Sequence, residues 1–337
     1  MDTVAILGAG AWGTALAIHL ARTHSAPAIR LWARDAAQVA ALGAARENER
    51  YLPGAALPPT IVVTADLQAA LAGATLILVA TPAGALRDVV ALTRRWDAVP
   101  LFWAGKGFIA MDAAPGVGLA HRVVGPAWPA PVGVISGPSF AEEVARGLPT
   151  AVTIAASDPN AAENVAQRLR GETFRAYVSD DITGVEVGGA VKNVLAIAAG
   201  ASDGLGFGHN ARAALITRGL AETGRFSAAL GGKRETLMGL AGLGDLVLTC
   251  TGDLSRNRRV GLALSQGRPL AATLAELGHI AEGVAAARDV RVLSRSLGVD
   301  MPICDAVYRV LYESLPPRLA VEALLAREPG PEFQGYL

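Results

Sequence analysis

The glycine-rich segment near the start of the chain is the feature that most constrains its fold. An apolar run, Thr3–Leu7, precedes Gly8, Gly10 and Gly13, and an apolar segment of helical period continues to Arg22. This order predicts a strand, a tight loop and a helix. Gly8 allows the turn, Gly10 lets the backbone approach a pyrophosphate, and Gly13 lets the helix pack on the strand, while the helix N-terminus attracts the anion. The context favours a dinucleotide site over a purely structural turn.

The residues after the second predicted strand, Ile29–Trp32, bear on the choice of coenzyme. An acid at this position favours the 2′-hydroxyl of NAD, and an arginine favours the 2′-phosphate of NADP. The chain offers both, Arg34 and Asp35. Because Arg34 comes first, we expect NADP(H), with Asp35 capping a helix over Ala36–Leu42. The alternative is a solvated Arg34 and a protein that also uses NAD(H).

Further apolar runs alternate with helical segments and set the fold class. Strands are predicted at Thr75–Ala80, Leu101–Ala104, Val132–Ile135, Thr150–Ala155 and Arg175–Ser179. From residue 181 the apolar residues recur at helical spacings. The sequence therefore predicts an α/β fold: a Rossmann-like, doubly wound, mostly parallel sheet over residues 1–180, followed by an all-helical C-terminal domain over residues 181–330.

Composition excludes several classes of protein. Of 337 residues, 52% are hydrophobic and 18% charged, which excludes a disordered chain. Thirty basic and thirty acidic residues give a net charge of zero, so nucleic acid is a poor candidate partner. Every long apolar run is interrupted by Gly, Pro or a charge, so no membrane span is expected. The acidic start does not match a secretory signal. The chain has only two cysteines, Cys250 and Cys304, which we expect to be buried thiols. Both features suggest the cytoplasm.

Polar residues follow several predicted strands, at the sheet edge where such folds bind ligands. Lys106 lies between two glycines, which leave room for a ligand beside its ammonium group. Gly137 and Ser139 follow the next strand. A solvated lysine and an ordinary turn are the alternatives, but the shared edge favours one pocket.

Two ionisable residues interrupt apolar stretches in the predicted helical half. Lys192 can reach water from a core helix, or it can be a partly desolvated ammonium with a lowered pKa that exchanges a proton. Asp245 lies in an otherwise apolar segment. A buried aspartate needs a partner, and a lysine would serve.

A basic cluster precedes a predicted helical start at Val260–Leu264. Its guanidinium, hydroxyl and amide groups, on Ser255, Arg256 and Asn257, suit a phosphate-sized anion, although a basic run can also be a solvated helix face. Glu282, before another helix, either faces the coenzyme or caps that helix.

Taken together, these segments resemble the NAD(P)-dependent glycerol-3-phosphate dehydrogenases of bacterial type. The resemblance is carried by Gly8–Ala17, Lys106–Gly107, Ser136–Ala141, Val191–Asn193 and Gly244–Arg258, and it extends from the first strand to about residue 325. It implies reversible hydride transfer between NAD(P)H and dihydroxyacetone phosphate, supply of glycerol 3-phosphate for phospholipid synthesis, a cytoplasmic location and a homodimer.

The resemblance also implies roles for individual residues. Lys192 corresponds to the proton donor and acceptor, and Lys106 to a contact with both substrate and coenzyme. Further substrate positions are Gly137, Ser139, Asp245, Ser255, Arg256 and Asn257. The coenzyme positions, with the glycine loop, are Gly8, Gly10, Ala11, Trp12, Gly13, Arg34, Lys106, Ala141, Arg256, Ile280 and Glu282.

The chemistry expected from these residues needs no metal, because hydride transfer does not require one and the histidines lack ligand spacing. Lys192, oriented by Asp245, would protonate the oxygen on which charge develops, Lys106 would stabilise that charge, and the Arg256 cluster would anchor the phosphate. Two rivals remain at this stage: a related reductase of keto or hydroxy acids, and a non-catalytic NADPH sensor that would not need Lys192.

Overall fold

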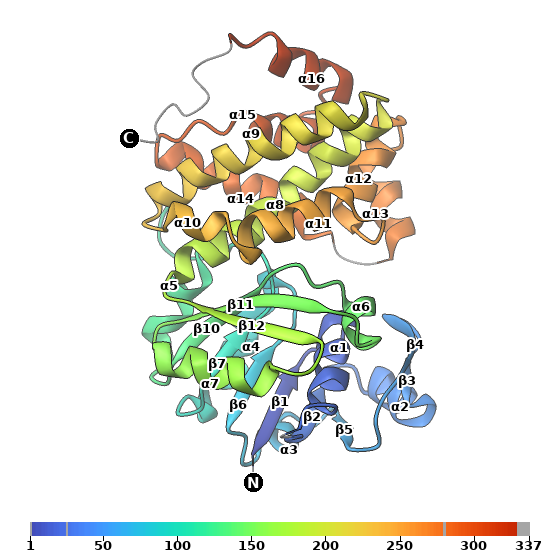
Figure 1. Ribbon diagram of the computed structural model, residues 1–337, viewed down its shortest axis with the longest axis vertical. Helices are drawn as coiled ribbons and strands as arrows, with labels where there is room; N and C mark the ends of the chain where they lie inside the picture. Colours follow the sequence, from blue (N-terminus) through green and yellow to red (C-terminus); the bar gives the residue numbers. More distant parts are fainter. Residues whose placement is uncertain (1, 25, 279–280, 329–337) are drawn as a thin grey trace.

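The computed structural model describes residues 2–24, 26–278 and 281–328, which form a sheet layered with helices and, above it in Figure 1, a helical C-terminal domain. The strands are β1 Thr3–Leu7, β2 Ala28–Trp32, β3 Glu47–Asn48, β4 Leu52–Ala56, β5 Ile61–Thr64, β6 Leu76–Val79, β7 Leu101–Trp103, β8 Ile109–Ala110, β9 Val117–Gly118, β10 Val132–Ser136, β11 Thr150–Ala156 and β12 Phe174–Ser179.

The helices of the sheet layer are short, and those that follow β12 include the two longest. The first group is α1 Ala11–Leu20, α2 Ala36–Ala45, α3 Leu67–Leu71, η1 Ala83–Ala85, α4 Leu86–Leu92, η2 Arg94–Trp96, α5 Ala120–Val124, η3 Gly125–Ala127, α6 Ala141–Ala145 and α7 Pro159–Leu169. The second is α8 Ile182–Gly204, α9 Gly208–Ala229, α10 Arg234–Leu237, η4 Leu240–Gly244, α11 Asp245–Thr251, α12 Arg256–Ser265, α13 Leu270–Leu277, α14 Glu282–Ser296, α15 Pro302–Tyr312 and α16 Pro317–Leu325.

The central sheet has the order β12-β11-β10-β7-β6-β1-β2-β5. All neighbouring strands pair in parallel except β10 and β11, which are antiparallel, so the expectation of a mostly parallel sheet is confirmed. The chain leaves β1 toward β2 on one side and returns to β6 on the other. This reversal between β1 and β6 is the switch point at which sheets of this type bind ligands.

Several local predictions need correction. The edge strand β5 was not predicted: only one of its four residues is buried, and it is a strand by its pairing with the neighbouring β2. Helix α2 continues past Leu42 through Gly43 and ends at Ala45, and the following Arg46, whose φ is +50°, is its C-cap. Helix α12 begins at Arg256, four residues before the predicted Val260. The basic cluster therefore forms the first turn of this helix and does not precede it.

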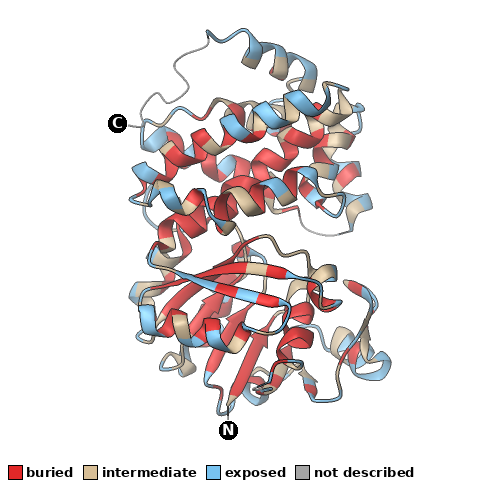
Figure 2. Cartoon of the chain, in the orientation of Figure 1, coloured by how far each residue is buried: buried red, intermediate tan, exposed pale blue. Residues whose placement is uncertain are grey.

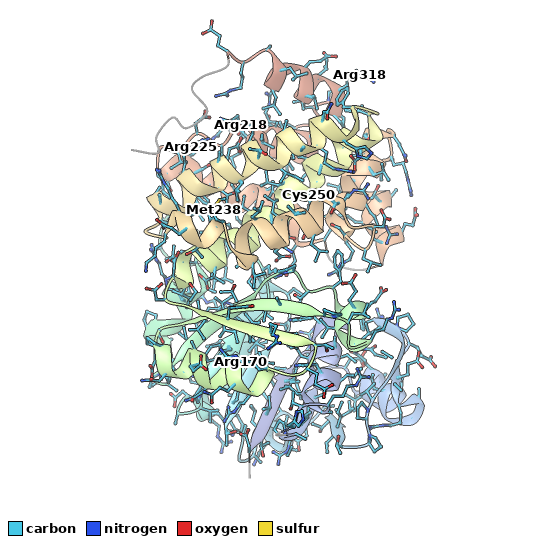
Figure 3. All side chains as sticks on the ribbon, viewed as in Figure 1. Arg170, Arg218, Arg225, Met238, Cys250 and Arg318 are labelled. Atoms are coloured by element: carbon cyan, nitrogen blue, oxygen red, sulfur yellow. The ribbon has the colours of Figure 1, made fainter. Side chains whose placement is uncertain are left out.

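Helix α8 is the centre of the helical domain, and Figure 2 shows it buried along most of its length. By length and composition it could cross a membrane, but 89% of its most apolar window is buried inside the protein, as expected of a core helix. A Cβ at Gly200 would lie 1.9 Å from the Arg258 carbonyl oxygen, so the backbones of α8 and α12 are in direct contact. Both cysteines are buried free thiols, as expected, and Figure 3 labels Cys250 within this domain.

Candidate active site

A carboxylate shared by two lysines lies where the sheet meets the helical domain. The Nζ of Lys106, in the loop after β7, donates to Asp245 Oδ2 at 2.5 Å. The Nζ of Lys192, on α8, donates to Asp245 Oδ1 at 2.5 Å. Asp245 is the first residue of α11, and its side chain is 1% exposed. The expectation that a buried Asp245 would pair with a lysine is confirmed, with two lysines in place of one.

The pKa values of this cluster follow from burial and mutual charge. Burial lowers the pKa of Lys192 to about 8, the charge of Asp245 opposes this shift, and the charge of Lys106 reinforces it. Burial would raise the pKa of Asp245, but the two ammonium groups outweigh it and hold that pKa below its ordinary value. The arrangement therefore keeps Asp245 ionised and brings Lys192 into a range in which an amine exchanges protons readily.

Thr249 is a member of this cluster that the sequence analysis missed. Its hydroxyl accepts a hydrogen bond from Lys192 Nζ at 2.8 Å and donates to the Asp245 carbonyl oxygen at 2.6 Å. The signal was available, since a residue four positions after Asp245 lies on the same face of a helix. The hydroxyl and the carboxylate together fix the direction of the Lys192 ammonium.

The glycines beside Lys106 act differently from the prediction. A Cβ at Gly105 would lie 2.7 Å from the Thr81 carbonyl oxygen, and one at Gly107 would lie 3.1 Å from Ala83 Cβ. They let the loop after β7 pack against the loop after β6, and they do not create open space for a ligand. The packing holds the base of Lys106 firmly at the sheet edge.

Gly137 and Ser139 join the same cluster through one carbonyl group. The Gly137 oxygen accepts from Lys106 Nζ at 3.2 Å and from Ser139 Oγ at 2.9 Å. Gly137 has φ +144°, and a Cβ there would lie 2.9 Å from Val152 Cα, so only glycine fits. These contacts bring Lys106, Gly137 and Ser139 together at the sheet edge, and a common pocket there stays a prediction.

The first turn of α12 approaches the cluster from the helical domain. Ser255 caps the helix by accepting from the Arg258 N–H at 3.2 Å. The Asn257 amide donates to Asn193 Oδ1 at 2.9 Å and accepts from the Gly283 N–H at 3.0 Å, which ties α12 to α8 beside Lys192 and to α14. Arg256 lies exposed in the same turn.

Glu282, at the start of α14, connects the helical domain to the loop after β6. Its Oε1 accepts from the Ala83 N–H at 3.3 Å. Burial raises the pKa of Glu282, and the Ala83 N–H and the charges of Arg256, Lys106 and Lys192 oppose that shift. Glu282 is thus within electrostatic reach of all three cations. Ile280 lies outside the described residues.

The glycine loop forms a cradle next to this cluster. Gly8 has φ +115°, and a Cβ at Gly13 would lie 1.9 Å from the Gly8 carbonyl oxygen, so turn and helix fit only as glycines. A Cβ at Gly10 would meet nothing within 4 Å, which leaves open space there. Helix α1 has no side-chain cap, because its N-cap residue is Gly10. The N–H groups of its first turn, which includes Ala11 and Trp12, are therefore available to an anion.

Other residues around the cradle also fit a dinucleotide. The buried Thr81 Oγ1 has no hydrogen-bond partner, and Thr81 Cγ2 would lie 3.1 Å from a Cβ at Gly8. Asp35 Oδ1 accepts from the Ala37 N–H at 2.9 Å, so the predicted cap of α2 is confirmed and this acid is occupied. Arg34 is exposed beside it, and Ala141 is the partly buried first residue of α6.

Within the described ranges, no group of three His, Cys, Asp or Glu side chains could hold a metal ion.

Comparisons with known proteins give a consistent result. Residues 3–162 and 181–322 match the models of the N-terminus and C-terminus of NAD-dependent glycerol-3-phosphate dehydrogenase. The chain is similar to two proteins named glycerol-3-phosphate dehydrogenase [NAD(P)+]: it is 55% identical to that of Aromatoleum aromaticum, over 98% of this chain and 99% of the relative, and 53% identical to that of Thiobacillus denitrificans, over 97% and 99%. The crystal structure of glycerol-3-phosphate dehydrogenase from Coxiella burnetii, 46% identical, superposes with a TM-score of 0.91 over 97% of this chain and 99% of that one.

Proposed function

Because this chain belongs to the NAD-dependent glycerol-3-phosphate dehydrogenase family, it is an NAD(P)-dependent oxidoreductase, and we propose how its residues interconvert dihydroxyacetone phosphate and sn-glycerol 3-phosphate. The observation that carries the proposal is the Asp245 carboxylate shared by Lys106 and Lys192 beside the glycine cradle. When bound, the coenzyme supplies the hydride that reduces C2 of the substrate.

Lys192 is the proton donor to the C2 oxygen in reduction and the proton acceptor in oxidation. It is buried, its direction is fixed by Asp245 and Thr249, and its pKa of about 8 suits both roles near neutral pH. Asp245 orients Lys192 and balances its charge. Lys106, held by Asp245 and the Gly137 carbonyl group, stabilises the negative charge that grows on the substrate oxygen.

The substrate phosphate binds at the first turn of α12. Arg256 supplies a guanidinium group there, and Ser255 and Asn257 set the position of the turn through their caps and cross-helix hydrogen bonds. Gly137 and Ser139 complete the pocket from the sheet side. Anchoring the phosphate orients C2 toward the coenzyme and Lys192.

At the β1–β6 switch point, Gly8, Gly10, Ala11, Trp12 and Gly13 would hold the coenzyme pyrophosphate. Arg34 would hold the 2′-phosphate of NADP(H), which favours NADP(H) over NAD(H), since Asp35 is already used as a helix cap. Ala141 and Glu282 would complete the coenzyme contacts; the same role is proposed for Ile280, which lies outside the described residues. Arg34→Ala should raise the Kd for NADPH about five- to tenfold while leaving that for NADH nearly unchanged. Equal losses would contradict the preference.

The proposal also covers the roles of the two domains and the place of the protein in the cell. Residues 1–180 form the coenzyme domain, and residues 181–330 form the domain that completes the catalytic site. We propose that the protein acts in the cytoplasm as a homodimer and supplies glycerol 3-phosphate for phospholipid synthesis.

A spectrophotometric assay tests the proposed reaction. Oxidation of NADPH, and separately of NADH, is followed at their shared absorbance band with dihydroxyacetone phosphate and with a panel of 2-keto acids. The expected result is turnover with the triose phosphate alone. Turnover of keto acids would favour the related reductases, and coenzyme binding without any turnover would favour a sensor.

A further inference from the structure

The carbonyl group of Ala9, in the middle of the glycine loop, accepts hydrogen bonds from two side-chain amides. Gln38 Nε2, on α2, donates to the Ala9 oxygen at 2.6 Å. Asn48 Nδ2, on β3, donates to the same oxygen at 3.0 Å. These donors lie 29 and 39 residues away from Ala9 along the chain, and neither residue belongs to the glycine motif.

Asn48 is held in place by its own surroundings. It is 2% exposed, and its Nδ2 also donates to Thr14 Oγ1 on α1 at 2.7 Å. The backbone of the β3–β4 turn closes the other side, because the Tyr51 N–H donates to both Asn48 Oδ1, at 3.3 Å, and the Asn48 carbonyl oxygen, at 3.2 Å. The Asn48 amide therefore has a fixed orientation, and it ties the glycine loop to α1 and to the β3–β4 hairpin.

The direction of the Ala9 carbonyl group determines the direction of the next N–H. The peptide bond is planar and trans, so the Ala9 C=O and the Gly10 N–H point to opposite sides. With the carbonyl oxygen directed at Gln38 and Asn48, the Gly10 N–H points away from them. Glycine at position 10 has little resistance to rotation of this peptide, so the loop by itself does not maintain the orientation.

We propose that Asn48 and Gln38 are positioning residues for the coenzyme pyrophosphate. By holding the Ala9 carbonyl oxygen, they keep the Ala9–Gly10 peptide from turning that oxygen toward the phosphates and keep the Gly10 N–H on the side of the anion. The inference rests on the proposed coenzyme site, and it predicts an effect common to NADPH and NADH because both carry the same pyrophosphate.

The test measures binding of coenzyme fragments to the full chain, with no substrate present. ADP-ribose contains the pyrophosphate, whereas 2′-AMP lacks it and contains only the adenosine and the 2′-phosphate. Gln38→Met removes one donor from a partly exposed helical position and keeps the length of the side chain. Gln167→Met, at an exposed position of α7, is the matched control.

Gln38→Met should raise the Kd for ADP-ribose by about three- to tenfold, the range expected for loss of one partly buried hydrogen bond, and should leave that for 2′-AMP unchanged. Asn48→Asp should have a larger effect, because it directs a carboxylate at the Ala9 oxygen. In turnover, the KM for NADPH and that for NADH should rise by the same factor, and by more than kcat falls. Gln167→Met should bind both fragments as the unmodified protein does.

Two results would overturn the proposal. One is unchanged ADP-ribose affinity in Gln38→Met, which decides the matter even if Asn48→Asp fails to fold. The other is an equal loss of ADP-ribose and 2′-AMP, which would indicate general damage to the coenzyme domain. Neither readout requires turnover, so failure of the proposed reaction would be seen separately, as intact ADP-ribose binding by a protein that does not reduce dihydroxyacetone phosphate.

Discussion

The glycine cradle and the lysine cluster are adjacent, but the first consists of peptide groups and the second of charged side chains. The cradle consists of backbone groups: Gly8, Gly10 and Gly13 place their peptide groups next to the open space at Gly10. The cluster consists of charged side chains: the partly buried Lys106 and the buried Lys192 and Asp245 balance one another. A site of the first kind should be damaged by adding atoms, and a site of the second kind by removing them.

Removing the Lys192 ammonium should have the largest effect. Lys192→Met keeps the apolar stem in α8 and deletes the proton donor, so kcat should fall by roughly 10²- to 10⁴-fold. Asp245 keeps Lys106 as its partner, and the Kd for NADPH should change little. Steady-state kinetics and fluorescence titration of NADPH measure the two effects. Lys233→Met, which removes an exposed lysine paired with Asp180, serves as the control. Full turnover by the Lys192 variant would exclude the acid–base role.

Arg256→Ala should act on the substrate and spare the proton transfer. Loss of a charged hydrogen-bond donor to a phosphate is worth about 1.5–3 kcal/mol, so the KM for dihydroxyacetone phosphate should rise about ten- to a hundredfold. Arg259→Ala removes the same charge from an exposed position of the same helix and should change the KM far less. Similar effects from both variants would contradict a specific phosphate contact by Arg256 and would indicate a general attraction between α12 and anions.

Adding one methyl group to the glycine cradle should weaken coenzyme binding without changing the stability of the fold. Gly10 has φ −78°, which alanine adopts freely, and its Cβ would meet no protein atom within 4 Å. The methyl group of Gly10→Ala would enter the space proposed for the pyrophosphate and should raise the Kd for NADPH on the order of tenfold, the cost of modest overpacking. The melting temperature should stay the same. Gly13→Ala, whose Cβ would lie 1.9 Å from the Gly8 carbonyl oxygen, should instead lower it. A Gly10→Ala protein that binds NADPH normally would place the pyrophosphate elsewhere.

The smallest expected effect is the dependence of the rate on pH. With a pKa of about 8 in the free protein, Lys192 loses its proton as the pH rises through 8, so kcat/KM for reduction at pH 8 should be about half its value on the acidic side. Oxidation of glycerol 3-phosphate needs the neutral amine and should change in the opposite direction. Rate profiles in both directions between pH 6.5 and 9.5 provide the measurement. Profiles that fall together as the pH rises would indicate a different titrating group.

Particular elements show how far prediction from sequence extended. Strands that are long and apolar, such as β1 and β10, were predicted within one residue of their observed ends, because their burial makes the hydrophobic pattern continuous. The edge strand β5 was not predicted, since its pairing with β2 joins segments distant in the chain. The early start of α12 was missed although its signal is local, because Ser255 caps the helix through the Arg258 N–H. The glycines around Lys106 were assigned to the site but for the wrong reason, because the loop that they pack against lies more than twenty residues earlier.

The geometry of the glycine loop was determined by the sequence alone, because strand, turn and helix N-terminus are encoded in a few consecutive residues. The lysine cluster was decided by the tertiary structure. Asp245 lies 53 residues from Lys192 and 139 from Lys106, and no local pattern says that one carboxylate serves both. The lowered pKa of Lys192 has the same origin, since it arises from burial and from a neighbouring charge, and both exist only after the helices have packed against the edge of the sheet.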